Sequence, residues 1–229
     1  RDRSPSRGLG DVYKRQIIVN KPAGQLSQGA KGFDLDLVSE VMTYNASQGK
    51  SAYAAIINRL DRPVSGLVLI ARNKSAAAKY STLMQKEGGF NKQYEALICG
   101  KLSEPKGTFV DYLKKDGRTN TSAIVPADAA ANDKDAKLSK LEYEVISYDE
   151  VKDITHVRIH LITGRHHQIR VQFASRRHPL VGDYKYATAD CGMDNAVKAV
   201  ALKRNQIALC AVSLTVDNKT YSVAPEFLL

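Results

Sequence analysis

One carboxylate stands between two arginines in the stretch Asn58-Arg59-Leu60-Asp61-Arg62-Pro63-Val64-Ser65-Gly66. Pro63 and Gly66 favour a turn, and the apolar residues 66–71 that follow have the length of a buried strand. A loop supported by a rigid strand is a usual position for catalytic groups, and neighbouring cations favour the ionised form of Asp61. Taken alone, however, the stretch is more typical of a surface ion pair in a turn.

Hydrogen-bond donors gather in a second segment, Thr163-Gly164-Arg165-His166-His167-Gln168-Ile169-Arg170. Gly164 allows the backbone to turn from a strand into a helix that we expect over residues 165–175, with Ile169 and Phe173 on its apolar face. Donors at the start of a helix suit a phosphate or a carboxylate. This segment therefore predicts an anion-recognition site.

The histidines and cysteines give little support for a metal site. Adjacent residues on a helix point about 100° apart, so His166 and His167 are not expected to converge on an ion. The three cysteines, at positions 99, 191 and 210, have no paired short spacing and their number is odd. These patterns argue against a disulfide framework and a cysteine zinc site, and no phosphate-cradling glycine loop is present. The spacing of these residues therefore predicts no metal site.

Composition and charge indicate a globular protein with a polyanionic partner. The chain has 229 residues, a formal net charge of +10 and a 43% share of hydrophobic residues. A basic balance of this size favours nucleic acid through counterion release, although it also occurs as a simple solubility feature. No apolar run reaches the roughly 20 residues of a membrane helix. We expect a monomer in the reducing cytoplasm, without membrane attachment.

Residues 1–16 are expected to form a tail outside the fold. They are rich in Arg, Ser and Gly and show no helical or strand period. Residues 11–16 also resemble the translated end of a transposon used in building sequencing libraries, which favours a non-native junction; a basic RNA-binding arm is the alternative. The remaining residues, 17–229, are predicted to form one catalytic domain.

Alternating apolar residues predict an α+β fold with a mixed, largely antiparallel β-sheet and flanking helices. The sequence favours hairpin-like neighbours over strand–helix–strand units. The strands that we expect cover residues 17–19, 66–71, 92–99, 108–113, 141–148, 155–162, 206–216 and 220–223.

Two further helices are expected in the first half of the chain. Asp34 can cap the first, whose predicted apolar face is Leu35, Val38 and Met42. Asn73 can cap the second, which Gly88-Gly89 would end; its predicted inward residues are Ala76, Tyr80, Leu83 and Met84. Residues 126–137 lack amphipathic order and are predicted to be a surface loop.

Four segments in register resemble the RluA-type RNA pseudouridine synthases. Residues 59–66 resemble the R-L-D motif, and residues 163–170 resemble the family's third motif. Residues 19–24, Val-Asn-Lys-Pro-Ala-Gly, resemble the first motif, and residues 92–97 resemble the strand with the active-site tyrosine. Residues 180–186, Leu-Val-Gly-Asp-Tyr-Lys-Tyr, match the segment that follows the third motif. The resemblance extends from about residue 17 to the C-terminus.

This resemblance implies an enzyme that isomerises uridines of rRNA or tRNA to pseudouridine after base flipping. It implies Asp61 as the catalytic carboxylate, Arg170 as its ionic partner and Tyr94 as the residue that stacks on the uracil. Arg59 would fill the space that the flipped base leaves or hold the phosphate. Lys21, Arg62 and Arg165 are weaker candidates for phosphate contacts.

The residues leave several points open. Asp61 could attack the nucleotide covalently or take a proton from the ribose. The chain departs from the family pattern at Asn58, where His is usual, at His166, where Thr, Ser or Lys is common, and at Leu209-Cys210-Ala211, where Leu-His-Ala is usual. A non-catalytic RNA-binding protein and a metal-dependent hydrolase that uses Asp61, His166 and His167 are the rival interpretations.

Overall fold

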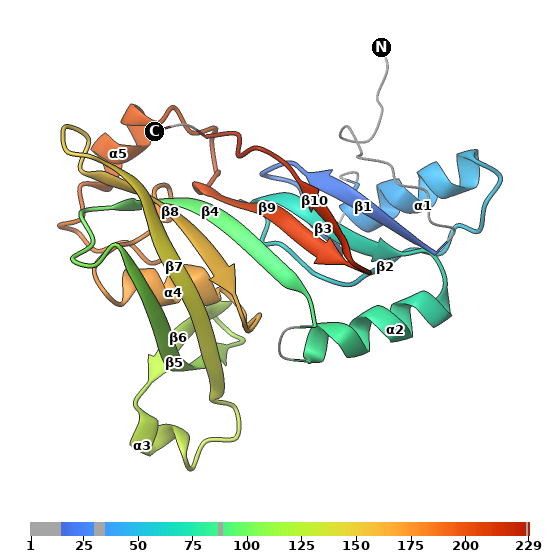
Figure 1. Ribbon diagram of the computed structural model, residues 1–229, viewed down its shortest axis with the longest axis horizontal. Coiled ribbons are helices and arrows are strands. Elements are labelled where there is room, and N and C mark those ends of the chain that lie inside the picture. The colour runs from blue at the N-terminus through green and yellow to red at the C-terminus, as the bar shows by residue number, and fades with distance from the viewer. Residues whose placement is uncertain (1–14, 30–34, 87–88, 228) are drawn as a thin grey trace. The chain divides into compact units, whose positions relative to one another are not determined.

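The computed structural model describes residues 15–29, 35–86, 89–227 and 229. These residues form two compact units (Figure 1). Unit 1 combines the described residues up to position 90 with residues 210–225, and unit 2 combines residues 91–209 with residues 226, 227 and 229. Each unit has a β-sheet with helices, which confirms the α+β class.

The sheet of unit 1 is built on β3, a strand with every residue buried. β1 pairs with β3 in antiparallel register from Gln16↔Ala71 to Lys21↔Gly66. β2 is antiparallel to the end of β3, whereas β9 is parallel to its start. The strands of unit 1 are β1 (Gln16–Lys21), β2 (Ala55–Ile56), β3 (Ser65–Ala71), β9 (Leu209–Val216) and β10 (Lys219–Ser222). This sheet is mixed, and β10 pairs with β9 in antiparallel register.

The sheet of unit 2 is antiparallel throughout, in the order β4-β8-β7-β5-β6. Its strands are β4 (Asn91–Cys99), β5 (Lys106–Asp116), β6 (Thr121–Val125), β7 (Lys137–Asp149) and β8 (Ile154–Leu161). Buried and exposed residues alternate along β5 and β8, so one face of the sheet packs into the unit and the other meets solvent. On the packed face Phe109, Tyr143 and Phe173 form an aromatic cluster.

The two helices of unit 1 differ in how well the sequence predicts them. α2 (Lys74–Gln85) is capped by Asn73 and packs Ala76 and Tyr80 against the core of the sheet, as expected. α1 (Leu37–Ser47) is capped by Asp36, and its buried residues are Leu37, Val41 and Asn45. The predicted cap Asp34 lies outside the described residues.

The predicted apolar face of α1 is wrong. Leu35 is 59% exposed and Met42 is 40% exposed, although both are predicted to point inward. The cap and the first buried residue lie two positions later than predicted, at Asp36 and Leu37, because Asp-Leu occurs twice in succession and packing selects the second pair.

The helices of unit 2 are short. They are α3 (Ala127–Ala130), α4 (Gln168–Ala174) and α5 (Met193–Ala199). α3 lies inside residues 126–137, which are predicted to be a loop, and α5 is not foreseen. At the other end of the chain, β1 begins at Gln16, the last residue of the predicted tail. Residues 1–14 lie outside the described residues, so the tail stays a prediction.

Candidate functional site

Asp61 lies in the loop that connects β2 to β3. Its side chain is half-buried, its carbonyl accepts the Val64 N–H at 3.0 Å, and Leu60 beside it is buried. Arg59 and Arg62 on either side are exposed. The loop therefore presents a carboxylate between two solvent-facing guanidinium groups.

The turn after β1 is tied to the Asp61 loop. The Ser27 hydroxyl donates to the Leu60 carbonyl at 2.6 Å and accepts the Leu60 N–H at 3.2 Å. Gly24 N–H donates to the Arg62 carbonyl at 2.7 Å, and Arg62 Nε donates to the Gly24 carbonyl at 2.9 Å. These bonds hold the main chain on both sides of Asp61.

Lys21 is fully buried at the end of β1. Its ammonium donates to the carbonyls of Pro22 and Gln25, each at 2.9 Å, and to the Arg62 carbonyl at 3.4 Å. Burial lowers the pKa of Lys21 to about 8, and the negative charge of Asp61 partly offsets this shift. Lys21 thus joins the two loops and carries positive charge near Asp61, a placement that suits this role better than the predicted contact with phosphate.

Asn58 and Gly66 fix the loop to β3. The Asn58 amide donates to the Leu67 carbonyl at 3.1 Å and accepts the Leu69 N–H at 2.7 Å. Gly66 has a φ of +118°, and a Cβ there would lie 2.4 Å from the Ala211 carbonyl oxygen. Only glycine allows β9 to approach β3 at this point. The departure of Asn58 from the family pattern therefore falls on a residue that anchors the loop.

Tyr94 lies on β4 in unit 2. It is 7% exposed and pairs with Ile159 of β8. Lys92, two residues earlier on the same face, is buried, and desolvation lowers its pKa. The Lys92 ammonium lies next to Gly164, which begins the approach to α4. Lys92 is not among the predicted catalytic or RNA-binding residues.

The approach to α4 is held by the side chain of Gln168. Its Oε1 accepts the Thr163 hydroxyl at 2.8 Å and the Arg165 N–H at 3.0 Å, while its Nε2 donates to the Lys140 carbonyl at 3.1 Å. Arg165 is exposed, and its Nε donates to the Leu138 carbonyl at 3.0 Å. This arrangement fixes the segment to β7 before the helix begins.

The histidine pair differs from its prediction. α4 begins at Gln168, so His166 and His167 precede the helix, and His167 has a φ of +54°. Because the two residues are not helical, their rings stack with centroids 3.7 Å apart and do not diverge. His166 Nδ1 is 2.8 Å from the Ser122 hydroxyl, and His167 Nδ1 is 2.6 Å from the Tyr186 hydroxyl.

Arg170 on α4 is 5% exposed and forms a bidentate ion pair with Asp183. Its Nε and Nη2 donate to the two carboxylate oxygens at 2.7 and 2.8 Å. Asp183 belongs to the segment 180–186, which the sequence flags only by resemblance. A guanidinium carries more N–H groups than one carboxylate accepts, so the ion pair with Asp183 does not exclude a second carboxylate partner. The pairing of Arg170 with Asp61 stays a prediction.

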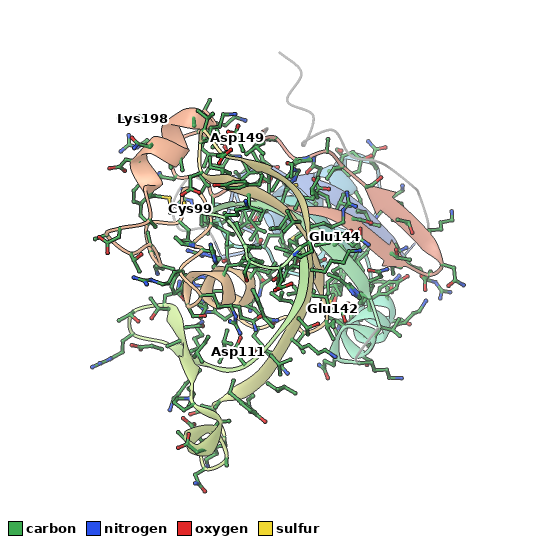
Figure 2. The ribbon with its side chains drawn as sticks, turned by 60° about the vertical axis from the view of Figure 1, so that its left-hand side comes forward. Cys99, Asp111, Glu142, Glu144, Asp149 and Lys198 are labelled. Atoms are coloured by element: carbon green, nitrogen blue, oxygen red, sulfur yellow. The ribbon has the colours of Figure 1, made fainter. Side chains whose placement is uncertain are left out.

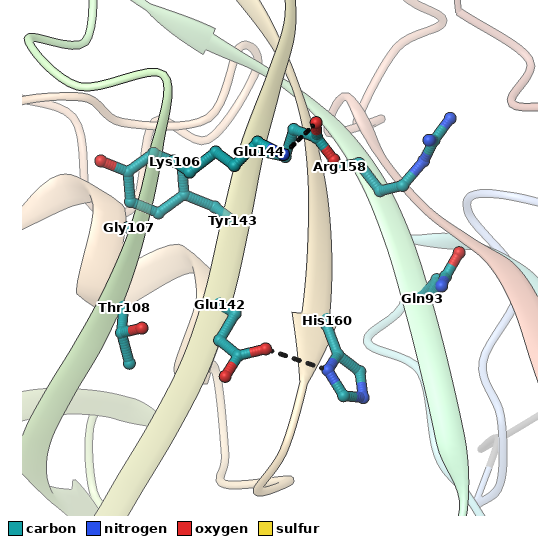
Figure 3. A pocket seen from close by; sticks show the side chains of 9 residues that line it. All are labelled: Gln93, Lys106, Gly107, Thr108, Glu142, Tyr143, Glu144, Arg158 and His160. Atoms are coloured by element: carbon teal, nitrogen blue, oxygen red, sulfur yellow. Dashed lines mark hydrogen bonds and ion pairs between the residues drawn. The ribbon is translucent and has the colours of Figure 1, made fainter.

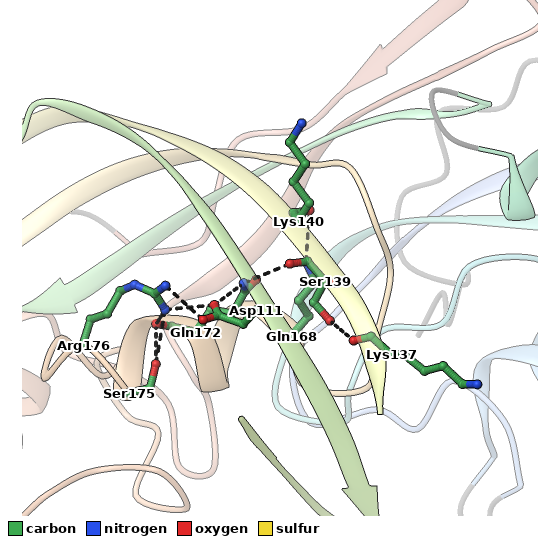
Figure 4. A network of polar contacts seen from close by, with 8 residues as sticks. All are labelled: Asp111, Lys137, Ser139, Lys140, Gln168, Gln172, Ser175 and Arg176. Carbon is green, nitrogen blue, oxygen red and sulfur yellow. Dashed lines mark hydrogen bonds and ion pairs between the residues drawn. The ribbon is translucent and has the colours of Figure 1, made fainter. Parts of the chain in front are cut away.

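A second bidentate pair holds α4 to β5 (Figure 4). The two terminal nitrogens of Arg176 donate to the Asp111 carboxylate at 3.0 and 3.1 Å, and the guanidinium lies over the Phe109 ring at 4.0 Å. Gln172 Nε2 also donates to Asp111, at 2.7 Å. These contacts fix the helix that carries Arg170.

The exposed face of the unit 2 sheet has a hollow of about 450 Å³ (Figure 3). The charges along it pair across strands: Lys106 with Glu144 at 2.9 Å, and His160 with Glu142 at 3.4 Å. Figure 2 places Glu142 and Glu144 together on β7. Gln93 lines the hollow, so Tyr94 points to the opposite face of β4. The hollow is therefore separate from Tyr94.

Metal-ligand side chains are scattered over the residues that the structure describes. In that part of the chain no three His, Cys, Asp or Glu side chains form a group suited to a metal ion. In the same residues, no helix is both long and apolar enough to cross a membrane.

The sequence pattern of one family covers most of the chain. The family described as RNA pseudouridylate synthase matches residues 15–175, which include the Asp61 loop, β4 and α4. The chain belongs to the RNA pseudouridylate synthase family. This finding confirms the resemblance seen in the sequence motifs.

Relatives of this family member include curated bacterial proteins. Ribosomal large subunit pseudouridine synthase D of Buchnera aphidicola (subsp. Acyrthosiphon pisum) is 32% identical over 172 residues, which cover 75% of this chain and 52% of that protein. The uncharacterised RNA pseudouridine synthase YhcT of Bacillus subtilis is 27% identical over 225 residues, covering 96% and 70%. The chain thus spans about half the length of the Buchnera synthase D.

Solved structures share the fold of this family member. Human RNA pseudouridylate synthase domain containing 4 aligns with a TM-score of 0.76 at 18% identity, over 96% of this chain and 88% of that one. Human RNA pseudouridylate synthase domain containing 1 aligns with a TM-score of 0.70 at 23% identity, over 94% and 82%. Both likenesses support the α+β fold.

Proposed function

We propose that this protein is an RNA pseudouridine synthase with Asp61 as its catalytic carboxylate. The observation that carries the proposal is the half-buried Asp61 on a loop fixed by backbone hydrogen bonds, with the buried Lys21 ammonium near it. Both open roles of Asp61 need a carboxylate, and the Lys21 ammonium supplies a positive charge near it. Membership of the family supplies the reaction.

The proposed reaction rearranges one nucleotide without a redox step. The bond between N1 of uracil and C1′ of ribose breaks, the base rotates, and C5 bonds to C1′; the hydrogen of C5 leaves as a proton and N1 gains one. Asp61 either attacks the nucleotide covalently or removes a proton from the ribose. Base flipping precedes these steps at a cost of a few kcal/mol.

The remaining site residues assist this reaction in the proposal. Arg59 fills the place of the flipped base or holds its phosphate, for which its exposure is suited. Tyr94 stacks on the uracil and serves as a general acid or base. Arg170 pairs with Asp61, and the exposed Arg62 and Arg165 contact phosphates. Lys21 maintains the charge and shape of the Asp61 loop.

Large-subunit ribosomal RNA is the first substrate to test, because several curated relatives are named for it. Transfer RNA is the second. In this proposal, residues 17–229 act together as one catalytic domain, and the protein works as a monomer in the cytoplasm with no metal or cofactor.

The decisive experiment compares the wild-type protein with Asp61→Asn. Unmodified transcripts of large-subunit ribosomal RNA and of transfer RNA are labelled with tritium at C5 of uridine, and release of tritium reports the reaction. We expect the wild type to release tritium and Asp61→Asn to be slower by about 100-fold or more, because an amide can neither attack nor accept the proton.

A matched control is Asp128→Asn, which neutralises an exposed carboxylate on α3. It should react like the wild type, and both variants should bind the transcripts as the wild type does. Normal product from Asp61→Asn would refute the catalytic assignment. Absence of product from the wild type on either transcript, with RNA still bound, would favour a non-catalytic RNA-binding protein.

A further inference from the structure

Tyr186 is in contact with the side chain that the proposed function pairs with Asp61. The guanidinium carbon of Arg170 lies 5.2 Å from the centre of the Tyr186 ring, within the range of a cation–π interaction. Asp183 accepts two hydrogen bonds from the same guanidinium. The segment after the third motif thus meets Arg170 with both a carboxylate and an aromatic ring.

The ring of Tyr186 is itself anchored. Its hydroxyl oxygen accepts the Ser122 N–H at 2.9 Å, so the hydroxyl hydrogen is available to His167 Nδ1, 2.6 Å away. The rings of His167 and Tyr186 meet edge to face, with centroids 5.6 Å apart and planes at 85°. β6 and the approach to α4 therefore hold Tyr186 from two sides.

The histidine pair supports this anchor. His167 has a backbone φ of +54°, a conformation that residues other than glycine adopt uncommonly. It stacks on His166, and Ser122 binds both His166, through its hydroxyl, and Tyr186, through its N–H. A residue held in such a conformation by its surroundings is typical of functional sites.

The two contacts restrict Arg170 in complementary ways. The two hydrogen bonds to Asp183 fix the distance and direction between the guanidinium and the carboxylate. The planar guanidinium can still rotate about the axis that joins the two groups. A ring against the guanidinium opposes this rotation. We propose that Tyr186 is a positioning residue that holds the Arg170 guanidinium in the orientation needed for the reaction. This inference rests on the proposed function, in which Arg170 assists Asp61.

A neighbouring tyrosine provides the matched control. Tyr184 is two residues from Tyr186 and is 60% exposed, and its hydroxyl donates to Asp194 of α5 at 2.7 Å. Tyr184→Phe removes a hydroxyl hydrogen bond from the same segment, away from the Arg170–Tyr186 pair. The test therefore compares Tyr186→Phe and Tyr186→Leu with Tyr184→Phe.

Two readouts are needed. The first is the single-turnover rate of tritium release from the labelled ribosomal or transfer RNA transcript, together with the affinity for that transcript. The second is the Nε–H signal of Arg170 in a proton–nitrogen NMR spectrum of arginine-labelled protein, assigned by its loss in Arg170→Lys. The NMR signal reports the guanidinium environment whether or not the protein has activity.

We expect a graded loss. Tyr186→Leu should slow the single turnover by about tenfold with RNA affinity within about twofold, because only the orientation of Arg170 changes. Tyr186→Phe keeps the ring but loses its anchor, and should slow the reaction by about threefold. The Arg170 signal should shift in both variants, more in Tyr186→Leu. Tyr184→Phe should match the wild type in both readouts.

The proposal is overturned if folded Tyr186→Leu keeps the wild-type rate and the wild-type Arg170 signal. If Tyr186→Leu fails to fold, Tyr186→Phe decides: an unchanged signal and rate overturn the proposal, and a shifted signal with a slower rate supports it. If the wild type forms no product, the proposed function fails, and the NMR signal alone then decides whether Tyr186 positions Arg170.

Discussion

The two regions that carry the predicted catalytic charges are held by different kinds of contact. The Asp61 loop in unit 1 is fixed by separate hydrogen bonds to main-chain atoms, which the side chains of Lys21, Ser27 and Asn58 and the Gly24 N–H make. Arg170 in unit 2 is fixed through side chains, by Asp183 and Tyr186. Asp61 is half-buried, whereas Arg170 is almost fully buried.

This difference predicts which region loses less stability when a residue is substituted. The hydrogen bonds of the loop are spread over several residues, so the loop should keep its shape when one exposed side chain such as Arg59 changes. A buried guanidinium has no such protection, because loss of its partner leaves an uncompensated charge away from water. Substitutions around Arg170 should therefore cost more stability than substitutions around Asp61.

The largest expected effect is that of Asp183→Ala. Removing one partner of a buried ion pair costs about 3–5 kcal/mol of unfolding free energy, and urea unfolding at neutral pH measures it. The matched control is Asp133→Ala, which removes the partner of the half-exposed Lys114 and should cost much less, because water screens an exposed ion pair. Equal losses in the two variants would show that the Arg170 region is not held by its buried pair.

A smaller effect is expected for Asn58→Ala. The substitution removes both hydrogen bonds from the Asp61 loop to β3 and leaves the Leu67 carbonyl and the Leu69 N–H without this partner. The expected loss is about 1–3 kcal/mol, measured in the same way. Asn195→Ala, at an exposed position of α5, is the control; a loss no larger than in that variant would mean that the Asn58 side chain does not hold the loop.

The most gradual effect is a change with pH in the stability of the wild type relative to Lys21→Met. The pKa of Lys21 is about 8 in the folded chain, below its ordinary value of 10.5. Between these values the unfolded chain holds a proton that the folded chain has lost, so the wild type gains stability relative to Lys21→Met as pH rises.

The gain should be at most about 1.4 kcal/mol per pH unit, and urea unfolding between pH 7 and about 10 follows it. Lys74→Met, at an exposed position of α2, is the control. A difference between wild type and Lys21→Met that stays constant with pH would show that the Lys21 ammonium remains protonated throughout.

The sequence predicted a helix correctly where its cap and its apolar face fit only one starting residue. Asn73 is followed by a single apolar helical face, and α2 begins where the pattern places it. Before α1 the sequence repeats Asp-Leu at positions 34–35 and 36–37. Each pair can start a helix, and only packing of Leu37 and Val41 into the core selects the second.

The site was predictable where a motif is contiguous and not where a contact joins distant residues. The motif around Asp61 gave the position of its loop. The partnership of Arg170 and Asp183 has no local signal, because the two residues are separated by 13 positions and come from different elements. The left-handed backbone of His167 was also missed, since glycine at position 164 drew the expected turn to an earlier residue.

The returning strand β9 has a consequence for how the protein is made. β3 meets β9 at Gly66 and Ala211, and the core of unit 1 includes Leu214 and Val216 together with Leu67 and Leu69. A ribosome delivers residues 65–71 long before it delivers β9. During that interval the start of β3 lacks its partner strand β9. An unpaired apolar strand can associate with other nascent chains. Unit 1 can therefore close only late in translation, after the whole β-sheet of unit 2 has emerged.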